Sequence, residues 1–173
     1  MPFLDVAQPS GSYKITELAF QSSGWTIGGI SPLTLDKGNV SLGFDTSNPY
    51  IRSNGSGTNV IEGPILLGSG TGGNASAVAQ AVSHLTFGSD ISFTGTGRNM
   101  MFAGGGTFEF HGAFNGADFM FLEGSTVLLA NPSGEAYVPT GGNKLRLNNA
   151  SAIWLHDNQI NATNKNGASG ICV

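Results

Sequence analysis

The side chains best suited to catalysis form a small group of acidic, basic and imidazole residues in the second half of the chain. Glu109 and His111 lie two residues apart in an alternating segment, so both should project from the outward face of one strand. Asp118 and Glu123 follow them, and Arg98 precedes them. Carboxylates that converge in one groove beside a cation would allow acid–base cleavage of an acidic polysaccharide. The preferred interpretation is simpler: these residues form a solvated outer face that discourages aggregation.

A second group, Arg146, His156 and Asp157, lies near the C-terminal end and has the same simple interpretation. Neither His111 nor His156 stands in a spacing typical of metal ligands, so no metal and no cofactor are predicted. His84 is interpreted as a surface residue of a helix or loop. The chain also lacks a Gly-x-Ser-x-Gly elbow, a phosphate-binding loop and a cysteine pair. These absences favour a protein that is not an enzyme.

Exposed aromatic side chains offer a different chemistry, because a ring can stack on a sugar. Trp25, Trp154 and Tyr50 are the candidates for such a binding surface. Trp154 lies between Ile153 and Leu155, so it should point outward if those two residues point inward. Contact with a loop or with a neighbouring chain is preferred over a sugar platform.

Composition and charge exclude several partners. Only 10% of the 173 residues are charged, the net charge is −4, and the seven Lys and Arg residues are scattered along the chain. The clustered cations that bind nucleic acid or an anionic membrane surface are therefore missing. No segment reaches 18 apolar residues, so no membrane-spanning segment is predicted. The 27 Gly and 11 Phe residues together indicate many short strands joined by tight turns.

The two ends of the chain carry their own predictions. Residues 1–12 are expected to form an N-terminal cap or a loose segment, and residues 13–173 a single domain. The first ten residues lack the basic and apolar regions of a signal peptide, so export signals are expected outside this chain, which is then a fragment. Cys172, the single cysteine, is interpreted as a free thiol without a role, with an intermolecular disulfide as the alternative.

The elements that must position these residues are short β-strands. Apolar residues alternate with polar or small ones at a period of two in several segments. These segments include residues 33–35, 40–44, 85–87, 91–93, 108–110 and 145–147. Clusters of Gly, Asn, Asp and Ser separate them, and these residues tolerate the conformations of tight corners.

The strands also recur at longer range. The pairs Ile91/Phe93, Phe108/Phe110, Val127/Leu129 and Leu145/Leu147 are separated by 17, 19 and 18 residues. A steady period predicts an all-β solenoid, a right-handed parallel β-helix with coils of about 17–20 residues. Stacking of the inward side chains is expected to place Phe93 over Phe110 and Met100 over Phe119.

Residues 74–84 interrupt this pattern. The segment is rich in alanine, contains no Gly or Pro, and starts with Asn74, a residue that often caps helices. The sequence therefore favours one short helix near residues 75–84, with an insertion loop as the alternative.

Several degenerate motifs follow one another over residues 13–161. They are YKITELAF at 13–20, SSGWTIGG at 22–29, SGTNVI at 56–61, GPILLG at 63–68, FEFHGAFNG at 108–116 and KLRLNNASA at 144–152. In this order they resemble the autotransporter-associated β-strand repeat family of bacterial surface proteins. The resemblance implies a parallel β-helix from the exported part of a large surface protein, with no shared catalytic residues. Segment 74–84 departs from the family's pattern.

The leading functional hypothesis is a rigid stalk or fibre-forming segment of a secreted or cell-surface bacterial protein. One alternative is an adhesin in which Trp154, Tyr50 or segment 74–84 contacts a glycan or a host protein. The other is a polysaccharide lyase or hydrolase built on the same scaffold. Because an open solenoid end is an unpaired sheet edge, the chain is also expected to associate with itself, end to end or laterally, and Cys172 could contribute there.

Overall fold

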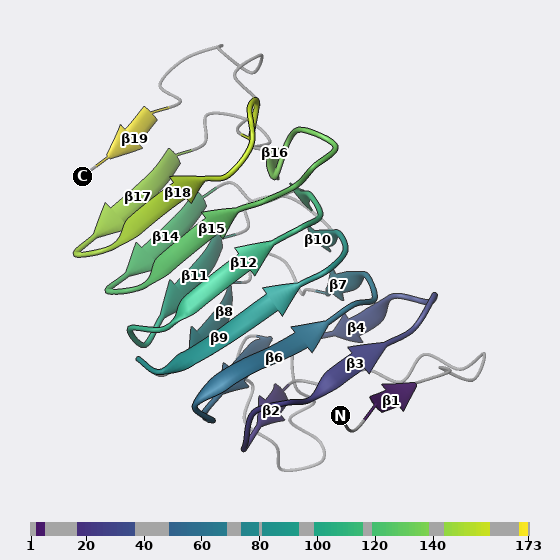
Figure 1. The fold of residues 1–173 in the computed structure, drawn as a ribbon. Coiled ribbons are helices and arrows are strands. Elements are labelled where there is room, and N and C mark those ends of the chain that lie inside the picture. The colour runs from purple at the N-terminus through teal and green to yellow at the C-terminus, as the bar shows by residue number, and fades with distance from the viewer. Residues whose placement is uncertain are drawn as a thin grey trace.

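The computed structural model describes residues 3–5, 17–36, 49–68, 74–79, 81–93, 99–115, 119–138, 144–159 and 170–172. Within these ranges the protein is all-β and contains no helix. The strands form three sheets, and every pair of neighbouring strands is parallel (Figure 1). The part of the chain that the structure describes holds no helix with the length and hydrophobicity needed to cross a bilayer.

The three sheets are called A, B and C, and the strands of each are given below in chain order. Sheet A contains β1 (Phe3–Asp5), β3 (Thr26–Gly28), β6 (Gly57–Ile61), β9 (Ser83–Phe87), β12 (Thr107–Phe110), β15 (Thr126–Leu129) and β18 (Ser151–Trp154). Sheet B contains β4 (Leu33–Leu35), β7 (Ile65–Leu67), β10 (Ile91–Phe93), β13 (Phe114–Asn115) and β16 (Tyr137–Val138). Sheet C contains β2 (Glu17–Phe20), β5 (Tyr50–Ser53), β8 (Asn74–Ala79), β11 (Asn99–Ala103), β14 (Phe119–Glu123), β17 (Lys144–Asn148) and β19 (Gly170–Cys172).

The chain passes through sheets C, A and B in that order and then returns to sheet C. One such passage is called a coil below; β5, β6 and β7 form one. Each strand inside a sheet pairs with the equivalent strands of the preceding and following coils, an arrangement consistent with a β-solenoid. The N- and C-terminal ends lie at opposite ends of the stack (Figure 1). Strand β1 falls within the segment 1–12 expected to form a cap, and it adds a strand to sheet A beside β3.

A single apolar core joins the three sheets. Alternation along several strands buries one face, as in β12, where Phe108 and Phe110 are buried while Thr107 and Glu109 are not. Phe102 of β11 packs edge-on against Phe108 and Phe110 with ring centroids 5.0 and 5.2 Å apart. Phe87 and Phe110 stack with centroids 5.0 Å apart. Parallel registration thus places aromatic rings of successive coils in direct contact.

Residues in register along sheet A form a continuous series, called the core row, and all of them except the last are buried. Its members, in stacking order, are Ile27, Ile61, Phe87, Phe110, Leu129 and Trp154. The predicted stacking of Phe93 over Phe110 is therefore wrong, because Phe93 belongs to sheet B and pairs with Leu67. The prediction of Met100 over Phe119 is wrong by one residue: Met100 pairs with Met120. A slip of one residue reverses which face is buried.

The coils are longer and less regular than the predicted 17–20 residues. Thr107 pairs with Thr126, an offset of 19 residues, and Asn99 pairs with Phe119, an offset of 20. Other offsets reach 25 for Asn74 with Asn99 and 34 for Thr26 with Val60. The predicted period mixed sheets, since Ile91, Phe108 and Leu145 lie in sheets B, A and C respectively. Alternation occurs up to three times per coil, so spacing alone does not identify equivalent strands.

The predicted helix near residues 75–84 is also wrong. Strand β8 occupies Asn74–Ala79, and β9 begins at Ser83. The register places Ala75 beside Met100 and Ala77 beside Phe102, two residues that are fully buried. Pairing with β5 on one side and β11 on the other overrides the helical preference of alanine.

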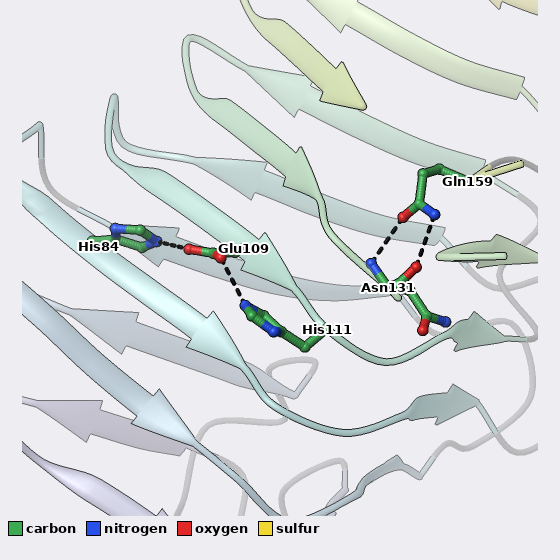
Figure 2. A network of polar contacts seen from close by, with 5 residues as sticks. All are labelled: His84, Glu109, His111, Asn131 and Gln159. Carbon is green, nitrogen blue, oxygen red and sulfur yellow. Dashed lines mark hydrogen bonds and ion pairs between the residues drawn. The ribbon is translucent and has the colours of Figure 1, made fainter. Parts of the chain in front are cut away.

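A buried glutamine fixes the loop between β15 and β16. The Nε2 of Gln159 donates hydrogen bonds to the carbonyl oxygens of Asn131 (2.9 Å) and Gly134 (2.6 Å). Its Oε1 accepts from the backbone N–H of Asn131 at 2.8 Å (Figure 2). Gln159 is completely buried and Asn131 is also buried, so water is no ready substitute for the hydrogen bonds between these two residues.

Gln159→Ala is expected to lower the free energy of unfolding by about 2 kcal/mol, because it leaves buried backbone groups without partners. Chemical denaturation followed by circular dichroism measures the change. Asp157→Ala is the matched control, since the Asp157 side chain is exposed and only its carbonyl bonds to Gln159. Equal effects of the two substitutions would contradict a role for the buried amide.

Candidate functional site

The candidate site lies on the outward face of sheet A, where β9 and β12 are neighbours. Leu85 and Phe87 of β9 are fully buried, so alternation turns His84 outward. Burial of Phe108 and Phe110 does the same for Glu109 on β12. The backbone N–H of His111, just beyond β12, donates to the Phe87 carbonyl at 2.9 Å and holds His111 at the end of the strand.

One carboxylate bridges two imidazoles in this site (Figure 2). Glu109 Oε2 lies 2.8 Å from His84 Nε2, and Glu109 Oε1 lies 2.7 Å from His111 Nε2. The His111 contact is a hydrogen bond, whereas the His84 contact is a close approach without hydrogen-bond geometry. The Glu109 side chain is only 20% exposed.

In this arrangement His84, Glu109 and His111 hold one another in place, which favours a structural role over acid–base catalysis. Each carboxylate oxygen of Glu109 already contacts an imidazole nitrogen. A general base needs a free oxygen to accept a proton from the substrate, and Glu109 does not offer one. Glu123 belongs to sheet C, so it does not join Glu109 on sheet A. Among the residues described, no group of His, Cys, Asp and Glu could hold a metal ion.

Two of the three residues in this cluster were predictable from the sequence. The prediction that Glu109 and His111 share a face is confirmed by their hydrogen bond. The interpretation of His84 as a surface residue of a helix or loop is wrong, because His84 lies on β9. The signal that could have found it is the alternation that continues from Leu85 and Phe87 back to His84.

The other predicted site residues lie apart from the cluster. Glu123 is on the outward face of sheet C, where its Oε2 accepts a hydrogen bond of 2.6 Å from Asn148 Nδ2. Tyr50 begins β5 of the same sheet and is half-buried. Asp118 and Arg98 lie outside the described residues.

The C-terminal group is dispersed as well. Arg146 lies on β17 of sheet C, whereas His156 and Asp157 follow β18 of sheet A. All three residues are exposed. Cys172 lies on β19, in register with Arg146.

Trp154 takes a position that the sequence did not settle. It pairs with Leu129 and so occupies the last place in the core row, while Ile153 pairs with Leu128 on the outward face. The condition for an outward Trp154, that Ile153 and Leu155 point inward, is therefore not met. Ile153, Trp154 and Leu155 are 43, 43 and 49% exposed, and they are called the end patch below. Trp154 is exposed because β18 is the last strand of sheet A in the described structure.

The bridge between Glu109 and His111 is expected to be weak. A double-mutant cycle of Glu109→Gln and His111→Ala should give a coupling of about 0.5 kcal/mol in urea denaturation, because both side chains are partly exposed. The control cycle pairs Glu123→Gln with His111→Ala. These residues lie on different sheets, so their effects should add. Equal coupling in the two cycles would contradict a specific bridge.

A scan against protein-family models, a search of curated proteins and a search of solved structures each found no match to this chain.

Proposed function

We propose that this chain is a structural segment of a secreted or cell-surface bacterial protein. Its three sheets would close into a right-handed parallel β-helix that serves as a rigid stalk or fibre-forming element. The observation that carries the proposal is the unbroken parallel stacking of sheet A from β1 to β18 over one apolar core. The resemblance to autotransporter-associated repeats and the extracellular location belong to the same proposal.

Rigidity follows from this way of stacking. Each coil is hydrogen-bonded to its neighbours along parallel strands, and the aromatic rings of adjacent coils contact one another. Displacing one coil sideways would break a full set of backbone hydrogen bonds and also open the core. Seven strands at a spacing of about 4.8 Å span about 29 Å. One chain is therefore a short unit of a stalk.

An adhesive role is the second candidate, and the end patch favours it. Large exposed apolar side chains gathered at one place are a common mark of a binding surface. A polysaccharide lyase or hydrolase has less support, because Glu109 and Glu123 lie on different sheets.

Single-molecule extension tests the structural role. Attachment points at the two ends of the chain load the coils in series, because the ends lie on opposite sides of the stack (Figure 1). The chain is expected to extend in coil-sized steps; an offset of 25 residues corresponds to about 90 Å. Smooth extension without resistance would overturn a mechanical role.

A glycan array with the native chain and Trp154→Ala tests the adhesive alternative, which predicts binding that the substitution removes.

A further inference from the structure

We infer that Asn59 sets the register in which three successive coils stack. These coils contain β2–β4, β5–β7 and β8–β10. The device is a buried polar cluster at the corner between sheets C and A, formed by Ser53, Asn59 and Ser83 with the backbone of Trp25. It acts on the choice between alternative pairings of the same strands, so it is independent of the proposed role as a stalk.

Asn59 is a polar residue in an otherwise apolar row. The strand pairings of sheet A place five residues in register: Asn59, Leu85, Phe108, Val127 and Ala152. The first four are fully buried. A buried amide costs free energy unless it is hydrogen-bonded, so packing alone would favour an apolar side chain at position 59. In coiled coils, a single buried asparagine of this kind fixes the register at a cost in stability.

The amide of Asn59 is hydrogen-bonded on both sides. Its Oδ1 accepts a hydrogen bond of 3.0 Å from the backbone N–H of Trp25 in the preceding coil. Its Nδ2 donates a hydrogen bond of 2.9 Å to Ser53 Oγ in its own coil. The hydroxyl of Ser53 is also hydrogen-bonded to that of Ser83, which begins β9 in the following coil, and both serines are buried. The cluster therefore links three coils through side chains.

Backbone pairing alone specifies the register weakly at this place. Strands β3 and β6 are in register at only two positions, whereas β6 and β9 are in register at five. A slip of two residues between β3 and β6 keeps the same faces inward, so alternation does not oppose it.

The amide of Asn59 opposes the slip that would bring Ile27 beside it. Trp25 lies just before β3, and its N–H bonds to a side chain. Within β3, backbone N–H groups point toward the neighbouring strands of the sheet. When Ile27 takes the place of Trp25, Asn59 Oδ1 therefore loses its donor and stays buried without a partner. A leucine at position 59 would meet no such penalty, because its contact with Ile27 is an ordinary apolar one.

Disulfide trapping with cysteine pairs reads the register directly, in a Cys172→Ser background. Thr26→Cys with Val60→Cys gives the in-register pair, whose strands lie about 4.8 Å apart, within reach of a disulfide. Thr26→Cys with Thr58→Cys gives the slipped pair. Its Cα atoms lie about 8 Å apart in the native register, beyond the range of a disulfide. With Asn59 in place, only the in-register pair should oxidise.

Asn59→Leu should raise the oxidised fraction of the slipped pair at least tenfold, because both registers then bury only apolar side chains at this position. Ile61→Val is the matched control: it alters a buried side chain of the same strand, leaves the amide intact and should leave the slipped pair reduced. Ser53→Ala removes one partner of the amide and should raise the slipped product about threefold. Circular dichroism confirms that each variant folds. Folded variants at Asn59 and Ser53 that trap only the in-register pair would overturn the inference.

Discussion

Replacing Phe102 with alanine should lower the free energy of unfolding by about 3–5 kcal/mol, since it opens a cavity at the centre of the core. Phe102 is fully buried and its ring contacts those of Phe108, Phe110 and Phe114. These three partners belong to β12 and β13, so one ring on sheet C supports both other sheets of its coil. The remaining rings are held by backbone pairing on both sides and cannot collapse fully into the space.

Thermal and chemical denaturation measure this loss, which corresponds to a fall in melting temperature on the order of 10 °C. Met101→Ala is the matched control on the same strand. Met101 alternates with Phe102, faces outward and is 37% exposed, so its truncation should change stability by no more than about 0.5 kcal/mol. Similar losses for Phe102→Ala and Met101→Ala would mean that the described core does not hold the coils together.

Adding a single methyl group at Gly112 is expected to cost about 3 kcal/mol, at the upper end for overpacking. A Cβ built there would lie 2.3 Å from the Ser89 carbonyl carbon, 2.5 Å from the Ser89 oxygen and 2.6 Å from the Asp90 nitrogen. All three atoms belong to the backbone of the preceding coil, so no side chain can rotate to make room. The two coils would have to separate at this corner.

Gly124→Ala distinguishes close approach from backbone conformation. Gly124 has φ of +64°, and a Cβ added to it would have no heavy atom within 4 Å, so alanine meets only the conformational penalty there, about 1 kcal/mol. Unfolding curves of the two variants provide the comparison. A smaller loss for Gly112→Ala than for Gly124→Ala would contradict close packing of successive coils at the corner between sheets A and B.

The all-β class could be predicted because alternation is a local property. Segments such as 85–87 and 108–110 show which residues face inward without any knowledge of their partners. The assignment of strands to sheets could not be predicted in the same way, because every sheet presents the same pattern. The Ala-rich strand β8 is not predictable from its own sequence, because its conformation depends on pairing with β5 and β11.

The candidate site likewise contains one part that local sequence predicts and one part that depends on strand pairing. Glu109 and His111 lie on one strand, so spacing alone brought them together. His84 joins them across a pairing in which Thr107 and His84 are in register, an offset of 23 residues that the predicted coil length excluded. The exposure of Trp154 needed still more information, since it depends on which strands pair with β18, and β18 is the last strand of sheet A among the described residues.

The parallel stacking has a consequence for length. A coil with an offset of 19 residues and one with an offset of 34 both advance the stack by one strand spacing, about 4.8 Å. Residues inserted at a corner therefore lengthen the path of one coil and leave the length of the stack unchanged. The coils are therefore evenly spaced along the stack. Peptides grafted at equivalent corners of successive coils would be displayed at this fixed interval, whatever their own lengths.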